Sequence, residues 1–160
     1  KEVRMTDEIK KIQISNGAYA SVDHADFGLL SKSTSSLSRG YAMRFDSDRK
    51  SVYLHKEILS ADKKKTDHIN GNKLDNRRIN LRLATHQQNS FNQKTKKGSS
   101  IYRGVCWDKQ YNKWRARISI NYKGFLIGLF DSERHAAMAY DIAARDLYGK
   151  FSKLNFNDHN

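Results

Sequence analysis

The sequence is poor in the features that build disulfides, thiolate metal sites and membrane spans. It contains one cysteine, Cys106, and no proline in 160 residues. A single thiol excludes an internal disulfide and a cysteine-rich zinc site, and it favours the reducing environment of a cytoplasm. No apolar run approaches the ~20 residues that a membrane helix needs, so we expect no membrane function.

Acidic residues are also scarce. Asp and Glu number 17 against 30 Lys and Arg, which gives a net charge of +13. Residues 1–92 carry 17 basic and 11 acidic side chains, and residues 93–160 carry 13 and 6. Two basic halves favour a polyanion such as nucleic acid as the partner. Charge alone leaves open a structural basic protein of a ribonucleoprotein.

The length and the absence of a secretory leader predict one or two small domains. The polar segment at residues 93–100, QKTKKGSS, is typical of a linker. It separates a first region, residues 1–92, from a second, residues 101–160. The fold class that we expect is α+β, with a small β-rich segment at the N-terminus.

Local patterns in the first region predict short elements. Two apolar stretches around Ser15-Asn16-Gly17 predict a β-hairpin. Further along, we expect one or two helical turns at residues 23–32, a loop at 33–40, and strands at 41–45 and 51–55. The run at 65–92 is rich in Asn, Asp, Gly and Arg, and its lack of periodicity predicts a structured loop. Within it we expect a strand at 81–83 and a helix from Thr85 or His86 to about Asn92.

The second region has the clearest pattern. Strand-like runs lie at residues 101–107, 113–120 and 125–130, and a turn is expected at 121–124. In the middle run apolar and polar side chains alternate, so one face is apolar and the other carries arginines. The apolar face comprises Trp114, Ala116, Ile118 and Ile120, and the polar face comprises Arg115, Arg117, Ser119 and Asn121. We expect Trp114 in the core and leave Trp107 undecided.

A helix is expected behind these strands. Asp131-Ser132 is a helix-start signal, and Gly149 is placed to end the helix. Apolar residues recur between them at helical spacing, namely Ala136, Ala137, Tyr140, Ala143, Ala144 and Leu147. The predicted unit is therefore a three-stranded antiparallel sheet packed on one helix.

Three polar residues of the first region suit hydrolysis of a phosphodiester. The reaction needs a base for the attacking water, stabilisation of the charge on the phosphate, and help for the departing oxygen. The imidazole of His68 suits the first task, because its pKa lies near working pH. Asp67 and Asn89 offer hard oxygens to Mg²⁺ or a similar divalent ion such as Mn²⁺. Asp67 and His68 are adjacent, so they can act on one phosphate only if the strand ends there and the chain turns.

Residues 66–89, TDHINGNKLDNRRINLRLATHQQN, resemble the HNH motif of phage and intron-encoded homing endonucleases. The resemblance implies a ββα-metal core: strand, long loop, strand and helix, within residues 66–92. It also implies that His68 is the general base, that Asp67 and Asn89 are metal ligands, and that Asn80 braces the loop. Asn89 stands where many relatives have histidine, a variant that keeps an oxygen ligand.

Residues next to the motif are assigned with less detail. The segment LHKEIL, with His55, resembles the helix that usually leads into the motif, and we assign His55 no catalytic role. The lysine run at 63–65 is either simply solvated or also meets phosphates. Arginine forks match phosphate oxygens, so three arginines of the motif are candidate DNA contacts: Arg77, Arg78 and Arg82.

Residues 102–156 resemble the Apetala-two type domain of plant ethylene-response factors. The shared landmarks are Tyr102-Arg103-Gly104-Val105, Lys113-Trp114, Gly128 with Phe130, Ala136-Ala137 with Ala139-Tyr140-Asp141, and Leu154-Asn155-Phe156. The resemblance implies a sheet that enters the DNA major groove. The candidate DNA contacts are Arg103, Arg115, Arg117, Ser119, Asn121 and Lys123. Cys106, Arg117 and Leu126 depart from the plant pattern, so the plant recognition sequence does not transfer.

Together these features predict a metal-dependent DNA endonuclease of a mobile element, acting on double-stranded DNA in the cytoplasm of a bacterial or phage-infected cell. No protein partner is implied, and monomer or dimer stays open. One HNH site cuts one strand per event. The alternative is a sequence-specific DNA-binding regulator whose nuclease domain is inactive.

Overall fold

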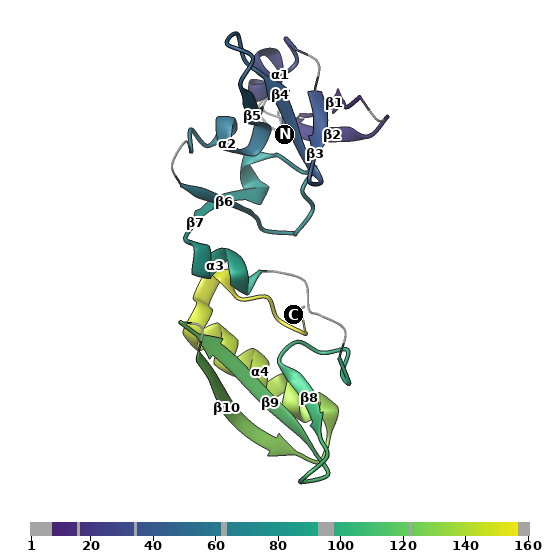
Figure 1. Ribbon diagram of the computed structural model, residues 1–160, viewed down its shortest axis with the longest axis vertical. Coiled ribbons are helices and arrows are strands. Elements are labelled where there is room, and N and C mark those ends of the chain that lie inside the picture. The colour runs from purple at the N-terminus through teal and green to yellow at the C-terminus, as the bar shows by residue number, and fades with distance from the viewer. Residues whose placement is uncertain are drawn as a thin grey trace, which may run out of the picture. The chain divides into compact units, whose positions relative to one another are not determined.

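The computed structural model describes residues 8–15, 17–33, 35–61, 64–92, 98–121 and 123–156 (Figure 1). Its contacts divide the chain into two compact units, Lys1–Asn89 and Ser90–Asn160. The protein is of mixed α and β type, with several small antiparallel sheets. No helix within the described ranges is long and apolar enough to cross a membrane.

The first unit opens with the expected hairpin. Strands β1 (Ile9–Gln13) and β2 (Tyr19–Asp23) pair antiparallel. Asn16 of the expected turn lies outside the described residues, while Gly17 has a φ of +83°, a conformation that favours glycine. Helix α1 (His24–Leu30) follows directly and makes about two turns, the longer of the two expected lengths.

A second sheet contains strands β3 (Ser35–Ser38), β4 (Tyr41–Phe45) and β5 (Ser51–Tyr53), in that order. The loop predicted at 33–40 is therefore wrong, because β3 occupies half of it. Its three serines favour a loop locally. Antiparallel pairing with β4 supplies the hydrogen bonds that make this segment a strand.

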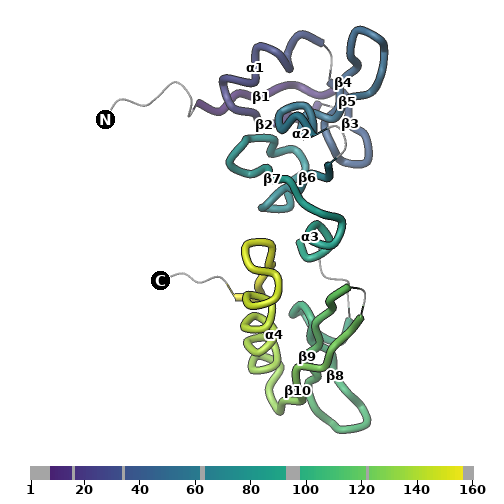
Figure 2. Tube along the Cα trace, turned by 90° about the vertical axis from the view of Figure 1, so that its left-hand side faces the viewer, coloured from purple at the N-terminus to yellow at the C-terminus, as the bar shows by residue number. Residues whose placement is uncertain are grey.

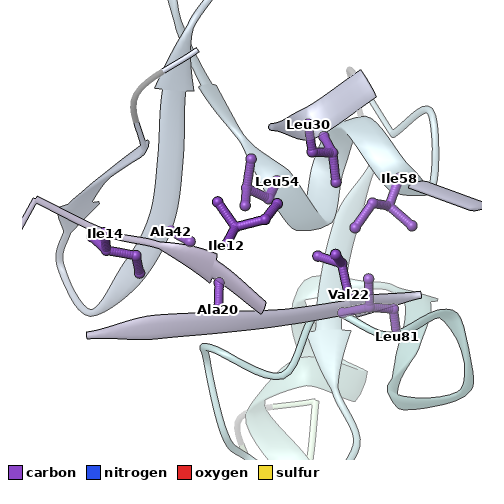
Figure 3. Close-up of a cluster of buried hydrophobic side chains, with 9 residues drawn as sticks. All are labelled: Ile12, Ile14, Ala20, Val22, Leu30, Ala42, Leu54, Ile58 and Leu81. Carbon is purple, nitrogen blue, oxygen red and sulfur yellow. The ribbon is translucent and has the colours of Figure 1, made fainter. Parts of the chain in front are cut away.

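Helix α2 (Leu54–Ile58) begins immediately after β5, so the strand expected at 51–55 ends two residues early. It covers the core of the first unit, drawn in Figure 3. The buried side chains of this core are Ile12, Ile14, Ala20, Val22, Leu30, Ala42, Leu54, Ile58 and Leu81. Leu81 comes from the segment that resembles the HNH motif, so this core also anchors the candidate site.

The candidate motif contains strand β6 (Lys65–His68), the 3-10 turn η2 (Arg78–Asn80), strand β7 (Leu81–Ala84) and helix α3 (His86–Phe91). Strands β6 and β7 pair antiparallel. The run at 65–92 is thus more regular than its lack of periodicity predicted, because pairing between its two ends forms the strands.

Thr85 and Gln88 fix the start of α3. The N–H of Gln88 donates to Oγ1 of Thr85 at 3.1 Å, and the N–H of Thr85 donates to Oε1 of Gln88 at 2.9 Å. This reciprocal pair is a capping box, which satisfies amides that the first helical turn leaves unpaired. Of the two expected starting residues, Thr85 is therefore the cap and His86 the first helical residue.

The second unit has the predicted architecture. Strands β8 (Val105–Asp108), β9 (Lys113–Ile120) and β10 (Lys123–Phe130) form an antiparallel sheet with β9 in the centre. Helix α4 (Glu133–Tyr148) lies along one face of this sheet (Figure 2). Tyr122, in the expected turn between β9 and β10, lies outside the described residues. The core between sheet and helix includes Val105, Ala116, Ile118, Ala136, Ala137, Tyr140, Ala144 and Tyr148.

Helix α4 begins and ends at the predicted signals. Ser132 caps its N-terminus, and Gly149 ends it with a φ of +52°. One predicted core position is wrong: Leu147 is 49% exposed, and Tyr148 is buried in its place. The hydroxyl of Tyr148 donates to the carbonyl of Ser119 at 2.7 Å, so burial leaves its polar atom satisfied.

Strand β8 starts later than the sequence suggested. We expected a strand over 101–107, but residues before Val105 form bends and turns. Gly104 has a φ of +72°, which is incompatible with a strand. A Cβ at this position would lie only 2.1 Å from Cδ2 of Tyr140, so the backbone and the ring approach closely here.

Candidate functional site

Asp67 and Arg82 form a buried ion pair across the β6–β7 pair, where they lie directly opposite each other. Nε and Nη2 of Arg82 donate to Oδ2 of Asp67 at 2.8 and 2.6 Å. The Asp67 side chain is only 5% exposed. A buried carboxylate is costly without a compensating charge, and Arg82 supplies it. The expected metal ligand and an expected phosphate contact are thus bound to each other.

His68 is the last residue of β6, and the chain turns directly after it. The N–H of Gly71 donates to the carbonyl of His68 at 2.8 Å, and Gly71 has a φ of +72°. The strand end and the turn that the chemistry required are therefore present. Within the strand itself, alternation directs Asp67 and His68 to opposite faces.

Asn76 holds the imidazole of His68. Oδ1 of Asn76 lies 3.3 Å from Nε2 of His68, and Asn76 is fully buried at 0% exposure. Its own backbone N–H donates to the carbonyl of Ser21 in β2, at 2.8 Å. Burial lowers the pKa of His68 below its ordinary value, and the contact with Asn76 opposes this shift only in part. The imidazole is therefore neutral near pH 7, as a general base requires.

Aromatic rings surround His68 on its core side. The ring centroids of His55 and Tyr41 lie 5.1 and 5.8 Å from that of His68. His55 is itself buried, and burial lowers its pKa to about 3. The sequence marked neither Asn76 nor His55 as part of the site. Asn76 is one of several asparagines in a polar run, and only its depth distinguishes it from the others.

Asn80 connects the two arms of the loop between β6 and β7. Its Oδ1 accepts a hydrogen bond from the N–H of Asn70 at 2.9 Å, and its Nδ2 donates to the carbonyl of Asp75 at 2.7 Å. Its carbonyl accepts from the N–H of Ile69 at 2.9 Å. With 6% exposure, Asn80 is an interior residue of the loop.

Asn89 lies on α3, where it is half-buried and its N–H donates to the carbonyl of Thr85 at 3.0 Å. Within the described ranges, no group of three or more His, Cys, Asp and Glu side chains is arranged to hold a metal ion. The two metal ligands expected from the sequence, Asp67 and Asn89, are a carboxylate and an amide, so they do not form such a group. Both are hard oxygen donors and fit Mg²⁺ or Mn²⁺ chemically.

The other two arginines of the motif also hold carboxylates. Arg77 forks onto Asp75, with two contacts of 2.7 Å, and Arg78 forks onto Asp26 at 2.9 and 2.7 Å. Hydrogen bonds to these acids raise the pKa of both arginines. Like Arg82, Arg77 and Arg78 are therefore engaged within the protein.

The polar face of the second sheet carries most of the remaining candidates. Arg117, Ser119 and Asn121 are exposed, whereas the apolar residues of β9 face α4. Lys123 is also exposed, but it pairs with Ile120 and so does not belong to the polar face. Arg115 is half-buried, and its Nη1 lies 3.0 Å from Oδ2 of Asp108. The alternation predicted for β9 is confirmed. Trp114 packs against the core as expected, with the ring of Trp107 edge-on at 5.1 Å.

Arg103 is placed differently from the other candidates. It precedes β8, and its Nη1 donates to the carbonyl of Phe91 at 3.3 Å. Its Nη2 is buried without a hydrogen-bond partner among the described residues. Its guanidinium therefore lies inside the second unit and not on the exposed face of the sheet.

Two family models match the chain. A model described as HNH endonuclease matches residues 62–91, and one described as AP2 domain matches residues 100–150. The first match contains β6, β7 and α3, and the second contains the three-stranded sheet and all of α4. Both resemblances noted in the sequence are thereby confirmed.

Individual relatives agree with these models. A protein of Acanthamoeba polyphaga mimivirus, named an uncharacterized HNH endonuclease, is 42% identical over 89 residues, which are 56% of this chain and 46% of the relative. Protein 3.8 of Escherichia phage T7 is 35% identical over 89 residues, 55% of this chain and 73% of the relative. The AP2-like ethylene-responsive transcription factor ANT of Arabidopsis thaliana is 40% identical over 63 residues, 38% of this chain and 11% of the plant protein.

The chain spans less than half of the mimivirus protein and about a tenth of the plant factor, but nearly three quarters of the phage protein. The HNH segment and the AP2 segment follow each other along the sequence with no overlap. The chain therefore belongs to the HNH endonuclease family and carries an AP2 domain behind its HNH segment.

Proposed function

We propose that this protein is a metal-dependent endonuclease that hydrolyses phosphodiester bonds of double-stranded DNA. The observation that carries the proposal is the position of His68, whose imidazole is held by the buried Asn76 at the end of β6, where the chain turns. In the proposed organisation, residues 1–92 contain the nuclease, 93–100 are a linker and 101–160 bind DNA. The origin of two relatives in a phage and a giant virus supports a role in a mobile element.

In the proposed mechanism, His68 accepts a proton from the attacking water. Its pKa, lowered by burial, keeps the ring unprotonated before the reaction. Asn76 orients the ring through Nε2. Asn80 keeps the loop closed by joining Asn70 to Asp75, so that the turn after His68 is held in place.

Asp67 and Asn89 are the proposed metal ligands, from β6 and α3. Their donor set suits a hard divalent cation, and water and substrate complete the coordination. When bound, such an ion would act as a Lewis acid that stabilises charge on the phosphate and on the departing oxygen. Arg82 already holds one oxygen of Asp67, so its role toward the site is to orient that carboxylate.

The AP2 domain is proposed to supply affinity and register on the duplex. Its exposed residues Arg117, Ser119 and Asn121 follow the polar face of β9, where cations reach phosphates and polar groups reach base edges. Lys123, exposed at the start of β10, remains a candidate phosphate contact from the end of the sheet. Arg115 is a further candidate at the same face. The inward guanidinium of Arg103 supports a structural role for that residue instead.

Relaxation of supercoiled plasmid tests the enzyme proposal. The wild-type protein, with Mg²⁺ or Mn²⁺, should nick or linearise the plasmid, and chelation should stop it. The His68→Ala variant should bind the same DNA but leave it supercoiled. His135→Ala, which replaces a histidine of the second unit, is the matched control and should cleave like wild type. A wild-type protein that binds DNA and leaves it intact under every divalent ion would refute the proposal.

One observation favours the alternative, a DNA-binding regulator with an inactive nuclease domain. Oδ2 of Asp67 is already engaged by Arg82, as it would be if this carboxylate served structure alone. The plasmid assay separates the two functions, because a regulator binds without cleaving.

Salt dependence tests the proposed binding domain. If the AP2 domain contacts ~5 phosphates, a plot of log affinity against log salt concentration should have a slope of about -4 to -5. The variant Arg117→Gln should flatten this slope by about 1. An unchanged slope would assign DNA binding to the first unit.

A further inference from the structure

The three arginines of the HNH segment are committed to internal ion pairs. Arg77, Arg78 and Arg82 each fork onto a carboxylate, and each of those carboxylates is largely buried. An arginine that moved to a DNA phosphate would leave such a carboxylate unpaired, which proteins avoid. Cations of the first unit that hold no carboxylate are spared this cost, so they are the better candidates for its contacts to the DNA backbone.

A groove of about 470 Å³ lies beside the strand that carries the candidate site. It is formed by the start of β6, the end of β7 and the first turn of α3. The residues that line it are Lys64, Lys65, Leu83, Ala84, Thr85, His86 and Gln88. Two of these residues are lysines and none is acidic, so the lining of the groove carries a net positive charge.

Lys64 and Lys65 are exposed at this groove and, within the part of the chain that the structure describes, neither forms an ion pair with an acid. Lys65 and Asp67 are two residues apart on β6, so their side chains leave the same face of the strand, about 7 Å apart along it. The groove therefore continues the face on which the Asp67 carboxylate lies.

We propose that this groove binds a phosphate of the DNA backbone that flanks the one to be cleaved, with Lys64 and Lys65 as its cations. The proposal rests on the proposed nuclease function, because it takes residues 67 and 68 as the place of cleavage. It assigns the phosphate contacts of the first unit to this lysine pair and not to the motif arginines. Those arginines hold the loop, and the lysines hold the DNA strand.

The test measures binding without cleavage, in the presence of a chelator. Fluorescence anisotropy with a duplex selected from random sequence gives the affinity over a series of salt concentrations. The double variant Lys64→Gln, Lys65→Gln should lower the magnitude of the log–log slope by about 2, since each lost phosphate contact removes about 0.9. Because both side chains are exposed, the thermal melting of the variant should match that of wild type.

Lys11→Gln, Lys32→Gln is the matched control. Both lysines are exposed, belong to the same unit and line a different hollow on it, so the variant makes the same change in charge elsewhere. This control should leave the slope within about 0.5 of wild type. Equal losses in both double variants would show a general effect of net charge and would overturn the proposal, as would an unchanged slope in the Lys64 and Lys65 variant.

A second measurement locates the contact. Single neutral methylphosphonates are placed in turn along both strands of the same duplex. At one or two positions, the methylphosphonate should lower the affinity of wild type by about threefold to tenfold. At the same positions it should leave the affinity of the Lys64→Gln, Lys65→Gln variant unchanged. The absence of any such position overturns the proposal. Because neither measurement requires cleavage, a protein that fails in the plasmid assay can still pass here, and the two proposals fail separately.

Discussion

Arg82 donates two hydrogen bonds, of 2.8 and 2.6 Å, to the same carboxylate oxygen of Asp67. The two residues are direct partners in the β6–β7 pair, so the strand register itself creates the contact. The pair shows that the charges of the HNH segment are arranged first to hold that segment together. The residues proposed for catalysis are thus set in a framework of buried polar contacts, and each contact can be tested.

Replacement of Arg82 should destabilise the first unit strongly. The variant Arg82→Gln leaves the carboxylate of Asp67 buried without its cation, which typically costs about 3–5 kcal/mol in the free energy of unfolding. Arg78→Gln is the control, because the Arg78 side chain is 55% exposed and such pairs contribute about 1 kcal/mol or less. Urea denaturation followed by circular dichroism measures both. Equal losses in the two variants would contradict this account of the Asp67–Arg82 pair.

The stability of the first unit should fall as the pH is lowered, in part because of His55. Burial lowers the pKa of folded His55 to about 3, whereas an unfolded histidine titrates near 6.5. Between these values the unfolded state binds the additional proton. Stability is therefore complete above about pH 6.5 and is lost toward pH 3, by up to about 1.4 kcal/mol per pH unit.

Urea denaturation at a series of pH values checks this dependence. The variant His55→Phe keeps a ring in the pocket but cannot take up the proton. Between about pH 3 and 6.5 its free energy of unfolding should therefore change by about 1.4 kcal/mol less per pH unit than that of wild type. An identical slope in wild type and variant would show that His55 is not the group that titrates.

Asn76→Asp should shift the pH dependence of DNA cleavage. The substitution places a carboxylate where an amide oxygen now lies 3.3 Å from Nε2 of His68. A neighbouring negative charge favours the imidazolium, so the pKa of His68 rises relative to wild type. The base must be neutral to accept a proton, and cleavage should therefore be lost at higher pH in the variant than in wild type.

The logarithm of kcat/KM measured against pH gives the acidic limb of the profile for each protein. Asn76→Ala separates the orientation of the His68 ring from the effect of a charge beside it. This variant should lower kcat without shifting the acidic limb to higher pH. A limb that stays in the same place in Asn76→Asp would show that Asn76 does not act on His68.

Gly104→Ala should damage the second unit, because an added Cβ would lie 2.1 Å from Cδ2 of Tyr140 and 2.7 Å from the carbonyl oxygen of Arg117. The residue also has a φ of +72°. We expect a loss of about 2–3 kcal/mol or more from strain and overpacking. Gly28→Ala is the opposite case, an interior position of α1 with nothing within 4 Å of a new Cβ. It should stabilise the first unit by about 0.5–1 kcal/mol. Thermal unfolding of both variants tests the contrast.

Local patterns were sufficient wherever neighbouring residues decide the structure. The alternation over residues 114–121 determined which face of β9 is apolar, because side chains on a strand change sides at every residue. The signals at Ser132 and Gly149 fixed the ends of α4, because capping is a local interaction. The order of residues in the segment 66–89 was enough to recognise the HNH motif and to name candidate site residues.

Contacts between distant segments decided everything else. The serine-rich β3 is a strand only because β4 pairs with it, and Arg78 meets Asp26 from a position 52 residues away. No local pattern marks Asn76 as the partner of His68, because its depth comes from the packing of the loop against β2. The sequence by itself thus determined the chemistry available to the site. The tertiary structure decided which arginines are engaged in ion pairs and which lysines face solvent, because burial and pairing are properties of the folded chain.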